Sequence, residues 1–383
     1  MKQRISGRLV LKDRIVEDEL TIQDGIITHI GKNPDPHTTL WDLPGFLIYP
    51  GLIDVHLHGA LGIDFASGNP ADIETVGWDV ARDGVTGFLA SLTTLPHQEL
   101  IAVLKRLSRV PEITGAARFL GVHAEGPYLS KEYKALMKEE YIHAPNTKEL
   151  KEIAAAGKSL LKTMTFSPVY ENTDELIRWG KKHGIRMMIG HTAANAKQVR
   201  AALDQGASGY THFYNAMSPL HHRSDGTVSA GLSDSRGYVE LIADGVHVSE
   251  AAVKICVKAV GADRLILVTD AMPGKSMPDG EFTFSYLDCI KEKGRAYVKA
   301  SGRLAGSVIS LNKEIKNIKD WCGFTDTELA KAASLNPARL LGIADRYGSL
   351  EVGKAGDLAV FDEDYNCQLT LVNGEVVYRR VML

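Results

Sequence analysis

The sequence predicts an α/β protein in which a (β/α)8 TIM-like barrel is joined to a small β-sandwich domain formed by both chain ends. Through the middle of the chain, short apolar runs alternate with segments of helical periodicity, which is typical of parallel strands and crossover helices. Both ends instead alternate apolar and polar residues around turn signals, as half-buried antiparallel strands do. We place the small domain at residues 1–50 and 347–383, and the barrel at residues 51–346.

Eight apolar runs are the candidate barrel strands. They lie at residues 52–57, 87–92, 119–123, 163–166, 186–189, 209–212, 239–243 and 265–269. Eight βα units over this length predict a closed barrel rather than an open, doubly wound sheet. The carboxyl ends of the strands meet at one rim of such a barrel, so the chemistry is expected there. Residues 280–302 are interpreted as a hairpin inserted beside the eighth strand.

The two chain ends carry the strongest turn signals. Asp24-Gly25 interrupts the alternating pattern between residues 5 and 30. Near the other end, strands are expected at 358–361, 369–372 and 376–378, with Asn373-Gly374 as the hairpin turn between the last two.

The composition excludes several classes of protein. Of the 383 residues, 44% are hydrophobic and 24% are charged, and a formal net charge of -3 argues against nucleic-acid binding. The four cysteines are far apart, which excludes a thiolate metal site by spacing and favours a reducing compartment. The first residues lack the apolar run of a signal peptide or membrane span. We therefore expect a cytoplasmic protein without nucleic-acid or membrane partners.

Residues able to bind a metal follow five of the apolar runs. His56 and His58 close the first run, and their spacing of two places both imidazoles on one face of a strand. The other members of the set each follow a different run: Glu125, His191, His212 and Asp270. Because a barrel brings these strand ends to a single rim, the sequence predicts a metal site.

The types of side chain limit the metal and suggest the chemistry. Imidazole and carboxylate without thiolate suit one or two divalent ions, with Zn²⁺ or Fe²⁺ as first choices and Mn²⁺ or Co²⁺ as alternatives. Such an ion lowers the pKa of its water from about 15.7 to about 7. Asp270 is placed to accept the proton of that water and pass it to a leaving amine.

Several motifs carry a resemblance to a known family. Residues 50–59 (PGLIDVHLHG), together with the strand-end His191, His212 and Asp270, resemble the amidohydrolase superfamily. Within it, four segments resemble the N-acetylglucosamine-6-phosphate deacetylases: 123–127 (HAEGP), 215–220 (NAMSPL), 244–247 (DGVH) and 269–272 (TDAM). The similarity extends over essentially the whole chain.

The resemblance implies a role for each site residue. Glu125, His191 and His212 match the principal metal ligands, and Asp270 matches the catalytic acid and base and is included in the metal set. His56 and His58 match members with a second metal, which Glu125 would bridge. The implied substrate contacts are Asn215, Ala216, Arg223, His247, Leu304, Ala305, Gly306 and Ser307. Phosphate-binding residues in this family can come from a neighbouring subunit, so a homodimer is implied.

The implied reaction is hydrolysis of the acetamide of N-acetyl-D-glucosamine 6-phosphate to acetate and D-glucosamine 6-phosphate, in amino-sugar catabolism. The alternatives are N-acetylgalactosamine 6-phosphate or a different amide as the substrate. Two segments depart from the family pattern. Residues 191–195 read HTAAN, a change in the loop after the ligand, and residues 134–137 read KALM, where relatives carry a small residue followed by His or Gln. The polar substrate contact is therefore missing at Leu136-Met137, and His143 is a candidate replacement.

Three other features of the sequence bear on these expectations. A cyclic-amide hydrolase or deaminase on the same barrel often carries a carboxylated lysine at the end of the fourth strand, where this chain has Phe166-Ser167-Pro168. A catalytically inactive scaffold typically loses its ligands, whereas all six positions are intact here. His221 and His222 are interpreted as surface loop residues.

Overall fold

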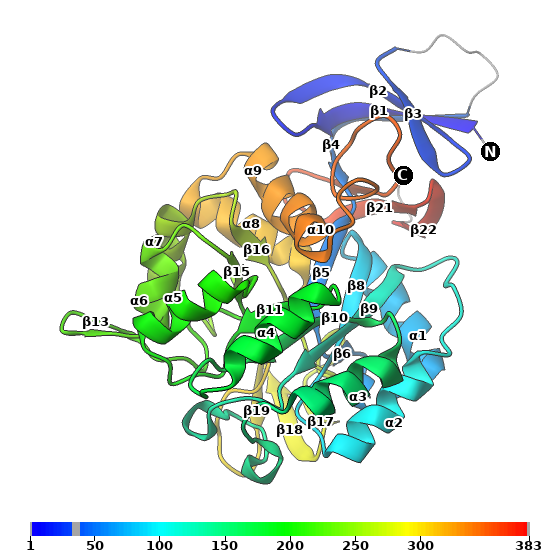
Figure 1. The fold of residues 1–383 in the computed structure, drawn as a ribbon. Helices are drawn as coiled ribbons and strands as arrows, with labels where there is room; N and C mark the ends of the chain where they lie inside the picture. The colour runs from blue at the N-terminus through cyan, green and yellow to red at the C-terminus, as the bar shows by residue number, and fades with distance from the viewer. Residues whose placement is uncertain (1, 33–38, 381–383) are drawn as a thin grey trace.

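The computed structural model describes residues 2–32 and 39–380. In Figure 1 a barrel surrounded by helices lies beneath a separate sheet, which contains the blue N-terminal strands and the red C-terminal strands. The two predicted parts of the fold are therefore both present. The exact domain boundaries stay a prediction, although β4 ends at Pro50 and β5 begins at Leu52.

The barrel consists of one eight-stranded sheet, which runs in the order β16-β15-β12-β11-β10-β9-β8-β5. Every neighbouring pair is parallel. The strands are β5 (Leu52–Leu57), β8 (Val85–Leu92), β9 (Arg118–Glu125), β10 (Leu161–Phe166), β11 (Arg186–Ile189), β12 (Gly209–Tyr210), β15 (Tyr238–Leu241) and β16 (Leu265–Leu267). Each of the eight predicted runs overlaps one of these strands, and β12, β15 and β16 end earlier than predicted.

The first and last strands of the sheet meet just beyond their ends and close the barrel. The Thr269 hydroxyl donates to Asp54 Oδ2 at 2.6 Å, and the Asp270 amide donates to the His56 carbonyl at 2.8 Å. Leu57 and Ala271 form a parallel bridge beside them. Residues on both sides of this seam are candidate metal ligands, so closure of the barrel itself brings them together.

Helices cover the outside of the barrel (Figure 1). They are α1 (Pro70–Ala81), α2 (His97–Leu107), α3 (Thr147–Gly157), α4 (Thr173–Lys182), α5 (Ala196–Gln205), α6 (Thr227–Ser233), α7 (Glu250–Val260) and α8 (Leu311–Cys322). After α8 the chain forms α9 (Asp326–Ala330), a π-helical turn (Lys331–Leu335) and α10 (Asn336–Leu341). Asn195 begins α5 through a capping box with Gln198, which satisfies amides that the first helical turn leaves unpaired.

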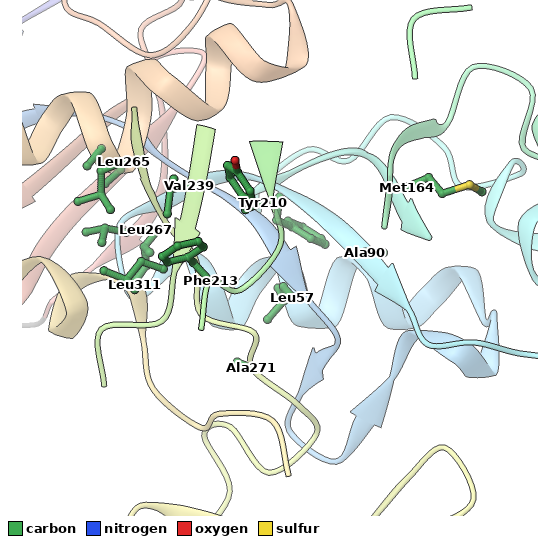
Figure 2. Close-up of a cluster of buried hydrophobic side chains, with 14 of the residues drawn as sticks. Leu57, Ala90, Met164, Tyr210, Phe213, Val239, Leu265, Leu267, Ala271 and Leu311 are labelled. Carbon is green, nitrogen blue, oxygen red and sulfur yellow. The ribbon is translucent and has the colours of Figure 1, made fainter. Parts of the chain in front are cut away.

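The strands alternate between two buried layers. In β16, Leu265 and Leu267 pack toward the helices, whereas Ile266 belongs to the cluster that fills the barrel interior. Figure 2 shows part of the outer layer, in which Leu265, Leu267 and Val239 lie near Leu311 of α8. This two-residue period explains why the strands appear in sequence as continuous apolar runs, since both faces are buried.

Both chain ends contribute to the second large sheet, which has seven strands in the order β22-β21-β20-β4-β1-β2-β3. Its strands are β1 (Lys2–Val10), β2 (Ile15–Gln23), β3 (Ile26–Ile30), β4 (Thr39–Pro50), β20 (Leu358–Phe361), β21 (Cys367–Val372) and β22 (Glu375–Arg379). β1 and β4 are parallel, and the remaining neighbours are antiparallel. A separate apolar cluster that includes Ile5, Leu20 and Leu369 stabilises this sheet.

Shorter elements surround the rim of the barrel. The predicted hairpin at 280–302 is a three-stranded antiparallel sheet of β17 (Gly280–Phe284), β18 (Leu287–Glu292) and β19 (Arg295–Val298). Two small ladders join β6 (Gly59–Ala60) to β7 (Ile63–Asp64), and β13 (Leu220–His221) to β14 (Ser224–Asp225). Single helical turns lie at Phe65–Ser67, Lys131–Tyr133 and Glu139–Tyr141. Across residues 2–32 and 39–380, none of the helices has the length and apolar character to span a lipid bilayer.

A short ion pair connects the barrel to the sheet of the chain ends. Arg118, at the start of β9, donates to Asp357 Oδ2 at 2.7 Å and to Asn373 Oδ1 at 3.0 Å. We expect Arg118→Met to lower the free energy of unfolding by about 2 kcal/mol, because the largely buried Asp357 would lose its cation. Urea denaturation measures this change. The exposed Arg109→Met is the control, and equal stability of both variants would contradict the prediction.

Candidate metal centre and substrate pocket

Three predicted ligands from different strand ends form the first group. Glu125 Oε1 lies 3.0 Å from His191 Nε2 and 2.9 Å from His212 Nε2. The two imidazole nitrogens are 3.0 Å apart. All three side chains are buried, and their facing atoms are close enough together to share one metal ion. The convergence expected from the sequence is therefore present.

His56, His58 and Glu125 form the second group. The Nε2 atoms of the two histidines are 3.2 Å apart. Glu125 Oε2 lies 3.4 Å from His58 Nε2, and Glu125 Oε1 lies 3.8 Å from His56 Nε2. Glu125 thus belongs to both groups and offers one carboxylate to two adjacent positions.

Asp270 lies beside the histidine pair. Its Oδ1 atom is 3.4 Å from both His56 Nε2 and His58 Nε2. Asp270 also faces the cavity, so its carboxylate is accessible to a bound molecule. A carboxylate in this place can exchange protons with a reacting group at the centre.

The hydrogen bonds of two histidines leave their other nitrogens free to bind a cation. His191 Nδ1 donates to the Tyr133 carbonyl at 2.7 Å, and His56 Nδ1 lies 3.4 Å from Glu240 Oε2. With the proton held on Nδ1, the Nε2 lone pair points at the carboxylate of Glu125. Two electron-rich atoms facing each other at such distances are stabilised by a cation between them. The donor set therefore fits a divalent metal of the kind that imidazole and carboxylate bind.

Left-handed backbone conformations turn three of these side chains toward the centre. His191, His212 and Asp270 have φ values of 45°, 29° and 46°. Non-glycine residues rarely adopt such values, and they cluster at functional sites when the surrounding fold enforces them. Each of the three residues lies two or three positions beyond the end of its strand, which is β11, β12 or β16.

The electrostatics of the centre favour bound positive charge. Burial opposes protonation of His58, but hydrogen bonds to Asp270 and Glu125 outweigh it and raise the pKa of His58 to about 10. In the same way, Glu125 outweighs burial and raises the pKa of His212 to about 9. Burial alone would raise the pKa of Glu125, yet His191, His212 and His58 together lower it well below its ordinary value.

The centre lies at the base of a cavity of about 240 Å³. Six of the predicted substrate contacts line it: Asn215, Ala216, His247, Leu304, Ala305 and Gly306. Ser307 does not, because it is buried against the seam, where its amide donates to the Asp270 carbonyl at 2.9 Å. The Ser307 hydroxyl donates to the Thr269 carbonyl, so this residue holds the backbone on both sides of the Thr269–Asp270 peptide bond.

Arg223 lies outside the cavity of its own chain. It is exposed at the turn between β13 and β14, which projects from the barrel in Figure 1. The neighbouring His221 and His222 are exposed too, as predicted.

The departures from the family pattern form an apolar wall. Leu136 and Met137 line the cavity together with Phe284 and Leu287, which come from β17 and β18. His143 does not replace the missing polar contact. It lies outside the cavity, with Nε2 3.4 Å from Glu149 Oε1.

Sequence reasoning missed the residues that support the ligands. Glu240 contacts His56 and also lies 3.4 Å from the His212 amide. Asp54 accepts a hydrogen bond from Thr269 across the seam between β5 and β16. The Tyr133 carbonyl accepts a hydrogen bond from His191. Of these residues, Glu240 could have been found from the sequence, because it is a carboxylate within the apolar run 239–243. A buried acid needs a polar partner, so its position indicates a contact inside the barrel.

The model of the Amidohydrolase family matches residues 47–377. This chain belongs to the amidohydrolase family. The match covers the complete barrel and the C-terminal strands of the seven-stranded sheet, and it begins within β4, so the assignment rests on far more of the chain than the metal motifs.

Two curated relatives are particularly similar to this amidohydrolase. An N-acetylgalactosamine-6-phosphate deacetylase of Escherichia coli is 35% identical over 371 residues, which is 96% of this chain and 97% of the relative. An N-acetylglucosamine-6-phosphate deacetylase of Vibrio furnissii is 35% identical over 332 residues, covering 86% and 83%.

Solved structures agree with the sequence comparison. The N-acetylglucosamine-6-phosphate deacetylase of Thermotoga maritima has a TM-score of 0.88 at 32% identity, with 99% of this chain and all of the other covered (100%). A mutant of the Mycobacterium smegmatis enzyme, in complex with N-acetyl-D-glucosamine-6-phosphate, has a TM-score of 0.92 at 28% identity. The match covers 98% of this chain and 99% of the other.

The contact between Glu240 and His56 gives a prediction about metal affinity. We expect Glu240→Gln to weaken metal binding by about 10-fold to 100-fold, because a carboxylate that orients a metal-binding histidine also increases its basicity. Competition with a chromophoric chelator measures the dissociation constant. Glu250→Gln, at an exposed position on α7, is the matched control. An unchanged constant in Glu240→Gln would show that the contact has no such effect.

Proposed function

We propose that this amidohydrolase hydrolyses the acetamide of N-acetyl-D-glucosamine 6-phosphate and releases D-glucosamine 6-phosphate and acetate. The observation that carries the proposal is the shared carboxylate of Glu125, flanked by histidines and by Asp270 at the base of a cavity. Relatives at 35% identity are named as deacetylases of amino-sugar 6-phosphates. We place the reaction in amino-sugar catabolism and in the cytoplasm, since a charged sugar phosphate does not cross a bilayer unaided.

In the proposed mechanism, His191, His212 and Glu125 would hold one divalent cation, and His56, His58 and Glu125 would hold a second. When bound, such ions polarise a carbonyl and supply an ionised water at neutral pH. Asp270 takes the proton of the attacking water and delivers it to the amide nitrogen, so that the amine leaves in neutral form. Glu240 and the Tyr133 carbonyl keep the histidines in the required orientation.

We propose Zn²⁺ or Fe²⁺ as the metal, with Mn²⁺ and Co²⁺ as alternatives, on the basis of the imidazole and carboxylate donors. The presence of both histidine groups favours two ions over one. Other reactions on this barrel receive less support. The bridging position is taken by Glu125, and the described residues that line the cavity include no lysine that could be carboxylated.

The substrate is proposed to bind with its phosphate away from the metals. Asn215 and His247 contribute polar groups to the lining of the cavity, next to Ala216. The described lining residues include no arginine or lysine, so the cation for the phosphate must come from elsewhere. We propose that Arg223 of a second subunit supplies it in a homodimer, because guanidinium groups pair well with phosphate.

N-acetylgalactosamine 6-phosphate is the second candidate substrate. The relative from Escherichia coli that is named for this epimer matches 96% of the chain. The apolar wall at Leu136 and Met137 also removes a polar side chain that could distinguish sugar hydroxyls. Discrimination of epimers would then depend on the polar groups in the lining of the cavity.

A substrate panel tests the proposed reaction. We expect acetate release from N-acetylated hexosamine 6-phosphates, loss of release after treatment with chelator, and recovery when a divalent metal is added back. The ratio of kcat/KM for the gluco and galacto epimers identifies the preferred substrate. Full turnover by protein shown by elemental analysis to be metal-free would refute the mechanism.

The role of Asp270 predicts a specific defect. Asp270→Asn should lower kcat by at least about 100-fold, because an amide cannot accept and return the proton. Its metal content should stay equal to that of the wild type, since the two ligand groups do not require Asp270. Steady-state kinetics and elemental analysis measure both quantities, and the exposed Asp345→Asn is the control. A kcat within a few-fold of the wild type would exclude the assigned role.

The proposed contribution of Arg223 separates two kinds of substrate. Arg223→Met should raise KM for the 6-phosphate substrate by about 10-fold or more, since it removes a charge-assisted contact. Any slow turnover of the substrate without phosphate should be unaffected. Mass photometry is expected to give a dimer for both proteins. A monomeric wild type, or equal effects on both substrates, would contradict the shared site.

A further inference from the structure

We propose that Glu314 and Asn317 of α8 are positioning residues that hold His247 in place for the substrate. They act through the backbone of Ala243, which lies two residues beyond the end of β15, on the way to the loop of His247. The inference rests on the proposed function in one respect, since it takes His247 as a substrate contact. It adds residues outside the cavity to those that determine substrate binding.

The first step is the pair of contacts from α8 to Ala243. The Ala243 amide donates to Glu314 Oε1 at 3.1 Å, and Asn317 Nδ2 donates to the Ala243 carbonyl at 2.7 Å. β15 ends at Leu241, so this residue lies beyond the ladder of the barrel. Two side chains one helical turn apart therefore provide the hydrogen bonds that a neighbouring strand would otherwise supply.

The second step leads from Ala243 to the imidazole. Asp244 Oδ1 accepts from the Val246 amide and from the His247 amide, each at 2.8 Å. Asp244 Oδ2 accepts from His247 Nδ1 at 2.7 Å, and His247 Nε2 donates to the Ala305 carbonyl at 2.6 Å. The ring is thus fixed at both nitrogens, and its position follows that of the residue next to Ala243.

The third step is the loss of folding stability that comes from burying the carboxyl group of Glu314. Its side chain is fully buried (0% exposed), and Oε2 has no hydrogen-bond partner within the described residues. Burial, together with the nearby carboxylates of Asp54 and Asp244, raises the pKa of Glu314 well above its ordinary value. A buried carboxyl group with an unpaired oxygen costs stability, and an apolar side chain would not. Among the described residues, the hydrogen bond from the Ala243 amide is the contact that explains an acid at this position.

Two variants remove the contacts separately. Glu314→Met and Asn317→Leu keep side chains of similar volume and lose the hydrogen bonds to Ala243. Each should raise KM for the sugar phosphate by about 10-fold and change kcat by less than about 3-fold, because a contact made equally in the ground and transition states affects binding alone. Glu314→Gln keeps an acceptor for the Ala243 amide and should restore most of the affinity.

A third substitution on α8 is the control for simple destabilisation. Asn312 is also buried, but its Nδ2 atom donates to the Tyr365 carbonyl at 2.9 Å and does not contact Ala243. Asn312→Leu should lower the melting temperature and leave KM unchanged. If Asn312→Leu raised KM as much as Glu314→Met, loss of stability would explain the effect and the proposal would be wrong.

Amide hydrogen exchange followed by mass spectrometry tests positioning without substrate. In Glu314→Met and Asn317→Leu, peptides that cover residues 243–248 should exchange at least about 10-fold faster, whereas peptides of the metal-binding strand ends should not change. Wild-type exchange across 243–248 in both variants would overturn the proposal. If the wild-type protein deacetylates no sugar phosphate, the proposed function fails, and the exchange data still decide whether α8 holds this loop. Should one variant fail to fold, the other provides the same test.

Discussion

The carboxylate of Glu125 is the interaction on which the candidate site depends. Glu125 is the last residue of β9, and its carboxylate meets His191 and His212 on one side and the His56–His58 pair on the other. Glu125 is the one residue that the two metal-binding groups share, so neither group is complete without it. The Glu125 oxygens lie between 2.9 Å and 3.8 Å from imidazole nitrogens of the two groups, so a cation bound among these atoms would stabilise the rim.

The seam between the first and last strands places Asp270 beside the His56–His58 pair. Asp54 and Thr269 bond across it, and Ser307 binds the backbone on the outer side of Asp270. The left-handed conformation of Asp270 directs its side chain inward, where it lies against the histidine pair. The left-handed backbone of Asp270, the hydrogen bonds across the seam and the position of its carboxylate thus belong to one local arrangement. The surrounding hydrogen bonds hold this arrangement in place.

The strand-end ligands could be predicted from the sequence because barrel topology fixes where strand ends meet, whatever their distance along the chain. Supporting residues could not be predicted in this way. Glu314 and Asn317 lie on a helix whose periodicity reveals only that one face is buried, and nothing in that pattern identifies the backbone group that they bind. His143 illustrates the opposite error. It is close in sequence to the missing contact, but the chain directs it to Glu149 outside the cavity.

Buried acids that are not candidate metal ligands also help to position the groups of the site. Asp54, Glu240 and Glu314 are each at most 3% exposed, and none of them forms an ion pair with lysine or arginine among the described residues. Each instead bonds a hydroxyl, an imidazole or a backbone amide that fixes a functional group. A protein selected for stability alone would replace such groups with apolar ones. Their positions around one rim indicate that the stability they cost is exchanged for the precise placement of the metal ligands and of His247.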